Sequence, residues 1–225
     1  MSDPQGRLIV FEGVEGAGKT TQLDRLASVL GRSGVDCRTW REPGGTIAGD
    51  AIRALLLDPA SSLSSRAEAL LFMASRAELV ERELRPALQK GAVVLLDRFF
   101  LSTYAYQVAG RGLSEEAIRA TNRLATNGLV PDLTVLLTLS ASEGLARAGR
   151  RGVPDRMERS GDAFHHRVEG AFAGFATERW QHGHEECGPL VTVDAAGDAS
   201  AVAARVLDVV TRQFTELRSA LGVVA

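Results

Sequence analysis

The sequence predicts an α/β fold in three layers, α/β/α, with a five-stranded parallel sheet between two layers of helices. Two observations carry this prediction. Short apolar runs alternate along the 225 residues with longer segments whose apolar residues recur every three or four positions. The apolar runs also lack polar alternation, which is typical of strands covered on both faces, as in a parallel sheet.

Five segments are predicted to be strands. Four are short runs of mainly branched apolar residues, and the fifth is weaker because it contains arginine and threonine. The four lie at 8–11, 92–96, 133–137 and 190–193, and the weaker fifth lies at 37–40. The first strand leads directly into a glycine-rich turn.

Five helices are predicted from apolar residues at helical spacing, at 20–30, 65–88, 114–126, 164–180 and 199–217. Pro86 is expected to bend or end the second of them, because proline lacks the N–H that a helix interior needs. Ser114 is a favourable N-cap residue, and two glutamates follow it in the first turn.

Composition indicates a single domain over residues 1–225. Hydrophobic residues make up 45% and charged residues 24%, and the formal net charge of −2 gives no general sign of nucleic-acid or membrane binding. Cys37 and Cys187 show no paired spacing and are expected to be free thiols. The start, MSDPQGR, lacks the basic and apolar run of a signal peptide, and no stretch approaches ~20 apolar residues. We therefore expect a cytoplasmic protein.

A phosphate-binding motif follows the first predicted strand and opens the first predicted helix. Its pattern is G-x-x-x-x-G-K-[ST], formed by Gly13, Val14, Glu15, Gly16, Ala17, Gly18, Lys19 and Thr20. Backbone N–H groups of such a loop surround phosphate oxygens, the lysine reaches the β- and γ-phosphates, and the threonine hydroxyl ligates Mg²⁺. The sequence thus predicts a nucleoside triphosphate site on a P-loop NTPase-type fold, with ATP and Mg²⁺ bound.

Other motifs in the sequence distinguish among the classes of P-loop protein. No N-K-x-D, which reads guanine in GTPases, occurs. Asp97 ends the third strand and suits Mg²⁺, while Arg98 suits a second phosphate group. A basic segment at 147–156 contains four arginines, two glycines and a proline. Small size, the Asp-Arg strand end and this segment favour a nucleoside monophosphate kinase with a short basic lid at about 147–160.

The chain resembles the thymidylate kinases over nearly its whole length. The similarity rests on seven stretches in the family's order, at residues 11–20, 41–46, 71–76, 97–98, 102–107, 127–133 and 155–158. The resemblance implies transfer of the γ-phosphate of ATP to dTMP, giving dTDP and ADP, and it implies a homodimer.

The resemblance also assigns residues to the thymine base. Phe72 would stack on the ring, and Arg76, one helical turn later, would hydrogen-bond a pyrimidine carbonyl. Thr103 and Gln107 would present a hydroxyl and an amide to the base edge. The alternatives are core packing for Phe72, a surface ion pair with Glu83 or Glu68 for Arg76, and helix-surface positions for Thr103 and Gln107.

The resemblance implies that Arg53 and Arg98 bind the acceptor phosphate bidentately. It also implies that Glu42 and Pro43 shape the loop beneath this phosphate. Glu15 would meet the sugar 3′-hydroxyl or the metal region. Lys19, Asp97 and Arg98 are the implied catalytic residues within the core of the domain.

The family divides by the place of a further catalytic arginine, in the phosphate loop or on the lid. Gly16 occupies the loop position here, whereas the lid supplies Arg147, Arg150, Arg151 and Arg156. The chain therefore resembles the bacterial lid-arginine type, with Arg151 aligned to the family's lid arginine.

Two other functions stay open at this stage. One is another deoxynucleoside monophosphate kinase, or a deoxynucleoside kinase of similar fold. The other is a regulatory module that binds ATP without catalysis, against which intact Lys19, Thr20, Asp97 and Arg98 argue.

Overall fold

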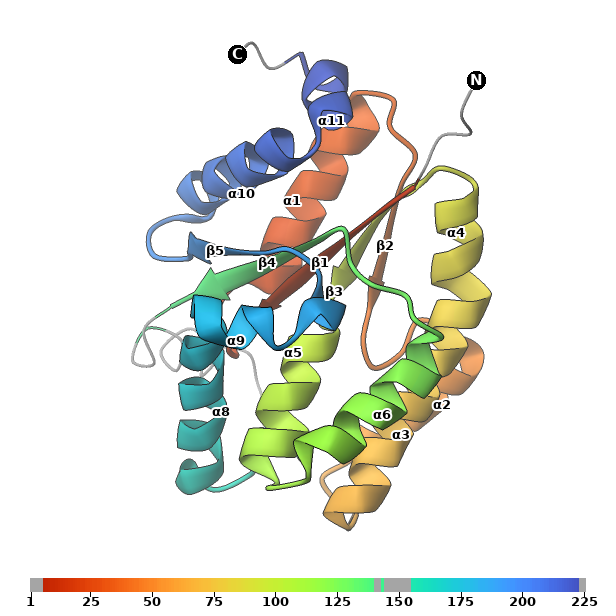
Figure 1. Ribbon diagram of the computed structural model, residues 1–225, viewed down its shortest axis with the longest axis vertical. Coiled ribbons are helices and arrows are strands. Elements are labelled where there is room, and N and C mark those ends of the chain that lie inside the picture. The colour runs from red at the N-terminus through yellow and green to blue at the C-terminus, as the bar shows by residue number, and fades with distance from the viewer. Residues whose placement is uncertain (1–5, 140–142, 144–154, 223–225) are drawn as a thin grey trace.

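The computed structural model describes residues 6–139, 143 and 155–222, and it contains a five-stranded sheet (Figure 1). Every pair of neighbouring strands is parallel. The strands lie in the order β2-β3-β1-β4-β5, with β1 at Arg7–Gly13, β2 at Cys37–Arg41, β3 at Val93–Asp97, β4 at Leu133–Thr138 and β5 at Leu190–Asp194. The predicted fold class and all five predicted strands are confirmed.

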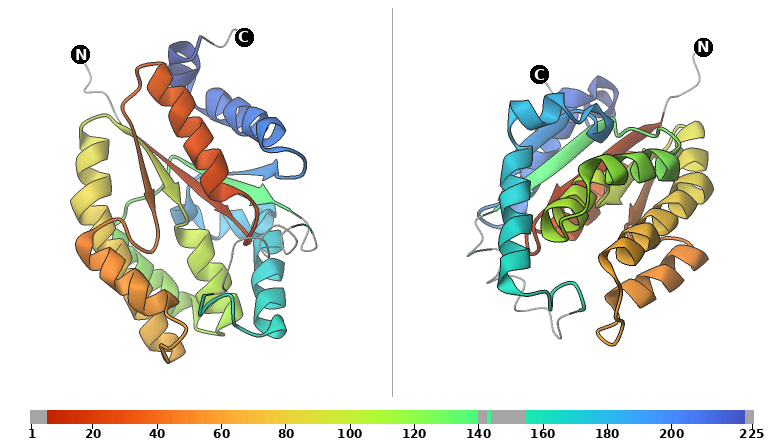
Figure 2. Two further views of the ribbon diagram at one scale, coloured as in Figure 1. Left: turned by 180° about the vertical axis from the view of Figure 1, so that it is seen from behind. Right: turned by 60° about the horizontal axis from the view of Figure 1, so that its bottom comes forward.

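Helices cover both faces of the sheet and form a separate core on each (Figure 2). One core joins Ile9 and Val135 of the sheet to α1 (Lys19–Arg32), α10 (Ala199–Gln213) and α11 (Thr215–Ala220). The other core joins Val10 and Leu96 to the helices on the opposite face. These are α3 (Ser65–Leu79), α4 (Arg85–Gln89), α5 (Phe100–Thr103), α6 (Glu115–Thr126) and α8 (Asp162–Phe175).

Three helices differ from their predicted limits. The predicted helix at 65–88 is α3, a π-helical segment η1 (Val80–Leu84) and α4, in unbroken helical conformation. Pro86 does not end this helix, because it lies in the first turn of α4 and the wider turn of η1 precedes it. The predicted helix at 164–180 is α8 (Asp162–Phe175) and α9 (Glu178–His182), and the one at 199–217 divides at Phe214 into α10 and α11.

Two helical regions that the sequence pattern did not predict follow the ends of β2 and β3. The first is α2 (Ile47–Leu57), whose N-cap residue Thr46 accepts a hydrogen bond from Gly49 N. The second is α5 with its π-helical continuation η2 (Tyr104–Gly110). A short 3₁₀ turn, η3 (Glu185–Cys187), precedes β5.

The register of the sheet brings three loops to one edge. Phe11 of β1 and Arg41 of β2 both pair with Asp97 of β3, so the carboxyl ends of these strands are level. In open parallel sheets, ligands bind beyond the carboxyl ends of the strands. The loops that follow β1, β2 and β3 therefore surround the position at which a site is expected.

Candidate active site

A cavity of about 660 Å³ lies at this edge of the sheet. It brings together most of the predicted site residues: Glu15, Gly16, Gly18, Lys19, Thr20, Glu42, Pro43, Arg53, Phe72, Arg76, Asp97, Arg98, Thr103 and Gln107. Gly13, Val14 and Ala17 do not line the cavity and complete the loop behind it. The loops after three strands and the helices α2, α3, α5 and η2 thus converge on one space.

The phosphate-loop motif forms the turn between β1 and α1. Gly16 and Gly18 have φ values of 77° and 88°, a left-handed conformation that glycine adopts without a steric cost. The buried side chain of Lys19 donates hydrogen bonds from Nζ to Gly13 O at 3.0 Å and Val14 O at 2.9 Å. Burial, followed by the charge of Arg98, lowers the pKa of Lys19 to about 8.

Thr20 and Asp97 meet although they lie far apart in the sequence. Thr20 Oγ1 donates to Asp97 Oδ2 at 2.6 Å. The other carboxylate oxygen, Asp97 Oδ1, is buried and has no hydrogen-bonding partner among the described residues. Buried polar atoms are rarely left without a partner, and hydroxyl and carboxylate oxygens are the ligands that Mg²⁺ prefers. The chemistry of this pair therefore fits a hard divalent cation.

Arg98 follows β3 with a φ of 74°, a left-handed conformation that is uncommon for a bulky residue. Its Nη2 donates to Glu15 Oε2 at 2.8 Å and its Nη1 to Ser102 Oγ at 2.9 Å. The guanidinium also lies 5.4 Å from the ring centroid of Tyr106. Burial alone would lower the pKa of Arg98, but Tyr106 and Glu15 outweigh it and raise that pKa, so the charge is permanent.

Glu12 fixes the segment that carries Arg98, a role that sequence reasoning missed. The carboxylate is fully buried and accepts hydrogen bonds from Phe99 N at 2.7 Å and Ser102 N at 3.1 Å. Ser102 Oγ donates to its second oxygen at 2.7 Å. The sequence does carry a signal for this role: Glu12 is an acidic residue inside an otherwise apolar strand, directly before the phosphate loop.

Arg76 is buried in an ion pair with Glu42, not on the surface with Glu83 or Glu68 as the alternative expectation had it. Its Nε donates to Glu42 Oε2 at 2.8 Å, and Nη2 donates to Glu42 and to Phe99 O. Nη1 donates to Asn122 Oδ1. Of the five N–H groups of a guanidinium, one on Nη1 thus stays without an acceptor among the described residues.

The loop after β2 is held by several hydrogen bonds. Arg53 Nη1 of α2 donates to Pro43 O at 2.9 Å, and Gly44 N donates to Ser75 Oγ at 3.0 Å. Burial and the neighbouring Arg41 lower the pKa of Arg53. Two arginines that repel each other at a cavity wall favour the binding of an anion there.

Like Arg76, the other three residues predicted to face the base lie on helices, namely α3, α5 and η2. Phe72 is half-buried and lines the cavity. Thr103 and Gln107 are each 2% exposed, so the alternative that they are helix-surface residues is wrong. Thr103 Oγ1 donates to Phe99 O at 3.4 Å, and Gln107 Nε2 donates to Glu68 Oε1 at 3.2 Å.

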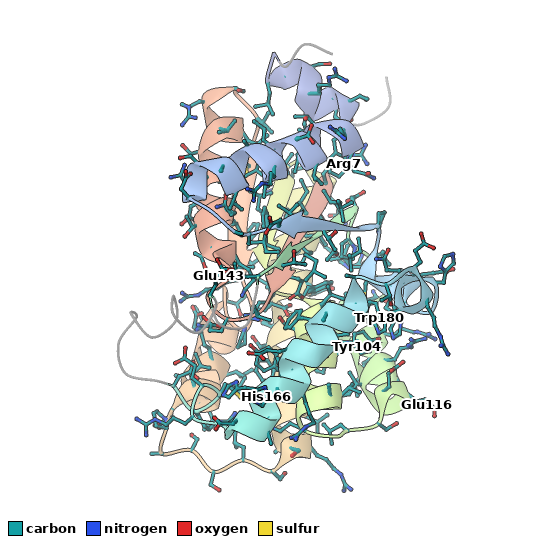
Figure 3. The ribbon with its side chains drawn as sticks, turned by 90° about the vertical axis from the view of Figure 1, so that its left-hand side faces the viewer. Arg7, Tyr104, Glu116, Glu143, His166 and Trp180 are labelled. Carbon is teal, nitrogen blue, oxygen red and sulfur yellow. The ribbon has the colours of Figure 1, made fainter. Side chains whose placement is uncertain are left out.

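The helix that carries Gln107 is supported from its far side by aromatic packing (Figure 3). Tyr104 lies edge-on to Trp180 of α9, with ring centroids 5.7 Å apart, and edge-on to His184 at 5.0 Å. The Tyr104 hydroxyl donates to Glu186 of η3, which also pairs with Arg119. These contacts fix the orientation of η2 against the sheet edge.

Of the predicted lid residues, only Arg156 lies within the described part of the chain; Arg147, Arg150 and Arg151 lie outside it. Arg156 Nη1 pairs with Glu68 Oε2 of α3 at 2.7 Å, and Nε donates to Leu56 O of α2 at 2.7 Å. The guanidinium of Arg156 is therefore engaged with α2 and α3.

Comparisons with known proteins agree with this geometry. A family model described as thymidylate kinase matches residues 11–182. The chain is 51% identical to a thymidylate kinase of Deinococcus radiodurans over 172 residues, 76% of this chain and 84% of that one. It is 43% identical to one of an Exiguobacterium species over 204 residues, 90% and 93% of the two chains. The crystal structure of thymidylate kinase from Ehrlichia chaffeensis superimposes with a TM-score of 0.71 at 30% identity, covering 92% of this chain and 100% of that chain. The chain belongs to the thymidylate kinase family, the phosphotransferases that convert dTMP to dTDP.

Proposed function

We propose that the chain transfers the γ-phosphate of ATP to dTMP inside this one cavity, giving dTDP and ADP. The observation that carries the proposal is that a single cavity includes Lys19 and Thr20 of the phosphate loop together with Phe72 and Gln107. Its volume lies in the range of small-molecule sites, ~300–1,000 Å³. Donor and acceptor nucleotides would thus share one space, and the walls of the cavity would exclude water from it.

The donor half is the phosphate loop. Backbone N–H groups of residues 13–20 would bind the phosphates of ATP. Lys19 Nζ would exchange the carbonyl oxygens of Gly13 and Val14 for oxygens of the β- and γ-phosphates. Thr20 and Asp97 would hold Mg²⁺, which when bound neutralises negative charge on the triphosphate.

The acceptor phosphate would bind between Arg53 and Arg98. Each guanidinium lines the cavity and is already fixed by a hydrogen bond, to Pro43 O and to Glu15 respectively. Guanidinium groups suit this because two parallel N–H groups match two phosphate oxygens. Glu15 would reach the sugar 3′-hydroxyl or the metal region.

The base would stack on Phe72. Arg76 would donate its one remaining N–H to a pyrimidine carbonyl, while its ion pair with Glu42 holds the guanidinium plane in place. Thr103 and Gln107 line the same part of the cavity wall and would contact the base edge.

The transfer step needs no general base. A phosphate oxygen of dTMP is already anionic and would attack the γ-phosphorus in line, displacing ADP. Lys19 and Arg98 are held in place before the reaction, so their charges stabilise the developing negative charge without reorganisation. The bond from the attacking oxygen forms as the bond to the β,γ-bridging oxygen breaks.

We assign a further cation to the lid at about 147–160, because Gly16 brings no side-chain charge to the phosphate loop. Arg151 is the first choice because it aligns with the lid arginine of the family, and Arg147 is a further candidate. Arg156, which is engaged by Glu68 and Leu56, is assigned the positioning of the lid base instead of direct contact with phosphate.

We also propose that the chain acts as a homodimer in the cytoplasm. Leu70 of α3 and Leu124 of α6 are 58% and 83% exposed, on two helices that pack together. Within the described residues, no helix has the length and apolar character needed to cross a bilayer. A Leu124→Glu variant should reduce the mass measured by light scattering to that of the monomer, whereas Ala204→Glu, on the opposite face of the sheet, should not.

A coupled assay of ADP release with dTMP, dUMP, dCMP and dAMP tests the proposed function. We expect dTMP to give the highest kcat/KM and the rate without any monophosphate to be negligible. ATP binding without monophosphate-dependent ADP release would favour a regulatory module, and release with thymidine but not with dTMP would favour a nucleoside kinase.

A further inference from the structure

Glu68 of α3 is a buried carboxylate, 1% exposed, that the reaction scheme above does not use. Its two oxygens accept hydrogen bonds from three other side chains. Arg111 donates from Nε to Oε1 and from Nη2 to Oε2, both at 3.0 Å. Arg156 Nη1 lies 2.7 Å from Oε2, and Gln107 Nε2 donates to Oε1 at 3.2 Å. One carboxylate therefore joins α3 to η2 and to the segment around Arg156.

The charge state of Glu68 is fixed by these partners. Burial alone would raise its pKa, but the hydrogen bonds from Arg111 and Arg156 outweigh burial and hold the pKa below its usual range. An ionised carboxylate only accepts hydrogen bonds. The Gln107 amide must therefore turn its nitrogen, not its oxygen, toward Glu68.

The orientation of the amide decides what Gln107 offers to the cavity. With Nε2 bound to Glu68, the other end of the amide is Oε1, an oxygen that only accepts hydrogen bonds. Gln107 lines the cavity. The side chain thus presents a hydrogen-bond acceptor to a bound base.

We propose, on the basis of the function proposed above, that Glu68 is a positioning residue that determines base specificity by orienting the Gln107 amide. Thymine and uracil carry a donor, N3–H, on the ring edge, whereas cytosine carries an acceptor at N3. An acceptor fixed in the wall pairs with the first two bases and repels the third. Sites built to receive an N–H discriminate strongly, because the wrong ligand leaves a buried polar group unpaired.

The two arginines contribute indirectly. They keep Glu68 ionised, and Arg156 also fixes its neighbours Asp155 and Met157, both of which line the cavity. The Glu68 carboxylate therefore fixes both the orientation of the Gln107 amide and the position of the adjoining part of the cavity wall.

The experiment compares dTMP with 5-methyl-dCMP, which has the same ring shape and methyl group but carries an acceptor at N3 and an amino group in place of the O4 carbonyl. The proposed Arg76 contact to O4 is unchanged in the Glu68 variants, so a change in the ratio of the two substrates reports on the contact to N3. In Glu68→Gln, the new amide can donate to Gln107 Oε1 and turn the Gln107 amide around. We expect the ratio of kcat/KM for the two substrates to fall about tenfold or more, the effect of one buried hydrogen bond. Glu78→Gln is the matched control, since Glu78 lies on the same helix in an exposed ion pair with Arg82; it should keep the wild-type ratio.

A purely structural role of Glu68 would lower both specificity constants equally and leave their ratio unchanged. Such a result in folded Glu68→Gln and Glu68→Asp, the latter withdrawing the carboxylate from Gln107 by one methylene, would overturn the proposal. If the Glu68 variants do not fold, Gln107→Met removes the amide while both arginine pairs stay, and an unchanged ratio there overturns it as well. A wild-type protein that does not phosphorylate dTMP would instead refute the proposed function.

Discussion

Lys19 donates hydrogen bonds to Gly13 O and Val14 O of its own phosphate loop. It is distant in sequence from the residues that we propose for binding dTMP. We predict that Lys19→Met abolishes phosphoryl transfer and leaves dTMP binding largely intact, because Lys19 faces the triphosphate. Calorimetry with dTMP and the ADP-release assay measure the two effects. Lys90→Met is the matched control, since Lys90 is the other lysine of the sequence and does not line the cavity. Lost dTMP affinity with normal turnover would contradict the assignment.

The pKa of Lys19, lowered to about 8 by burial, has a consequence for binding. Between about pH 8 and the unfolded value of 10.5, the unfolded chain binds more protons than the folded one, so this group makes folding more favourable as pH rises through that window. A bound polyanion favours the charged form. We predict proton uptake when ATP binds at pH 8.5 to 9, measured by calorimetry in buffers of different ionisation enthalpy. Equal uptake by wild type and Lys19→Met would refute the assignment to Lys19.

Replacing Phe72 by alanine distinguishes a side chain that stacks on the base from one that only packs in the core. Phe72→Ala should raise the KM for dTMP by a factor of ~5–150 and the KM for ATP little, since one base–aromatic stack contributes ~1–3 kcal/mol. Steady-state kinetics with each substrate varied in turn give both constants. A lower melting temperature with an unchanged KM for dTMP would show that the side chain only packs in the core.

At the scale of elements, the three central strands β1, β3 and β4 were predictable because both of their faces are covered, which leaves uninterrupted apolar runs. The edge strand β2 is partly exposed, and its pattern was correspondingly weak. The helix at 100–110 was not, since most of its side chains are buried and the stretch has no polar face to give a helical period. The phosphate loop was recognisable because its residues are contiguous. The pairings Arg76–Glu42 and Arg111–Glu68 join residues 34 and 43 positions apart, and only the packing of α3 against the other elements brings them together.

The lid that we propose at about 147–160 would supply the further cation. We predict that Arg151→Ala lowers kcat by ~10²-fold or more and changes each KM much less, because the contact forms fully only as charge develops. Arg150 lies next to it and can substitute in part, so the double variant Arg150→Ala/Arg151→Ala is the sharper test. Near-normal kcat in the double variant would show that the segment is a solvated basic surface.

At the scale of the whole molecule, the two halves of the cavity belong to different cores. The donor half depends on α1, which packs in the core on one face of the sheet, and the acceptor half on α3 and η2, which pack on the other. The end of β3 joins them: Asp97 contacts Thr20 of the donor half, and Arg98 contacts Ser102 of the acceptor half. If the two nucleotides bind as we propose, the parallel sheet sets the distance between them.

A single compound tests this arrangement most directly: thymidine and adenosine joined through their 5′ positions by five phosphates, one more than the four that dTMP and ATP bring together. Linking two ligands of one cavity makes the second binding event intramolecular. Titration calorimetry should give one molecule bound per chain, with a Kd at least ~10²-fold below those of ATP and dTMP, and with affinity lost in both Lys19→Met and Phe72→Ala. A stoichiometry of two, or a Kd no lower than that of ATP and insensitive to Phe72→Ala, would contradict the account.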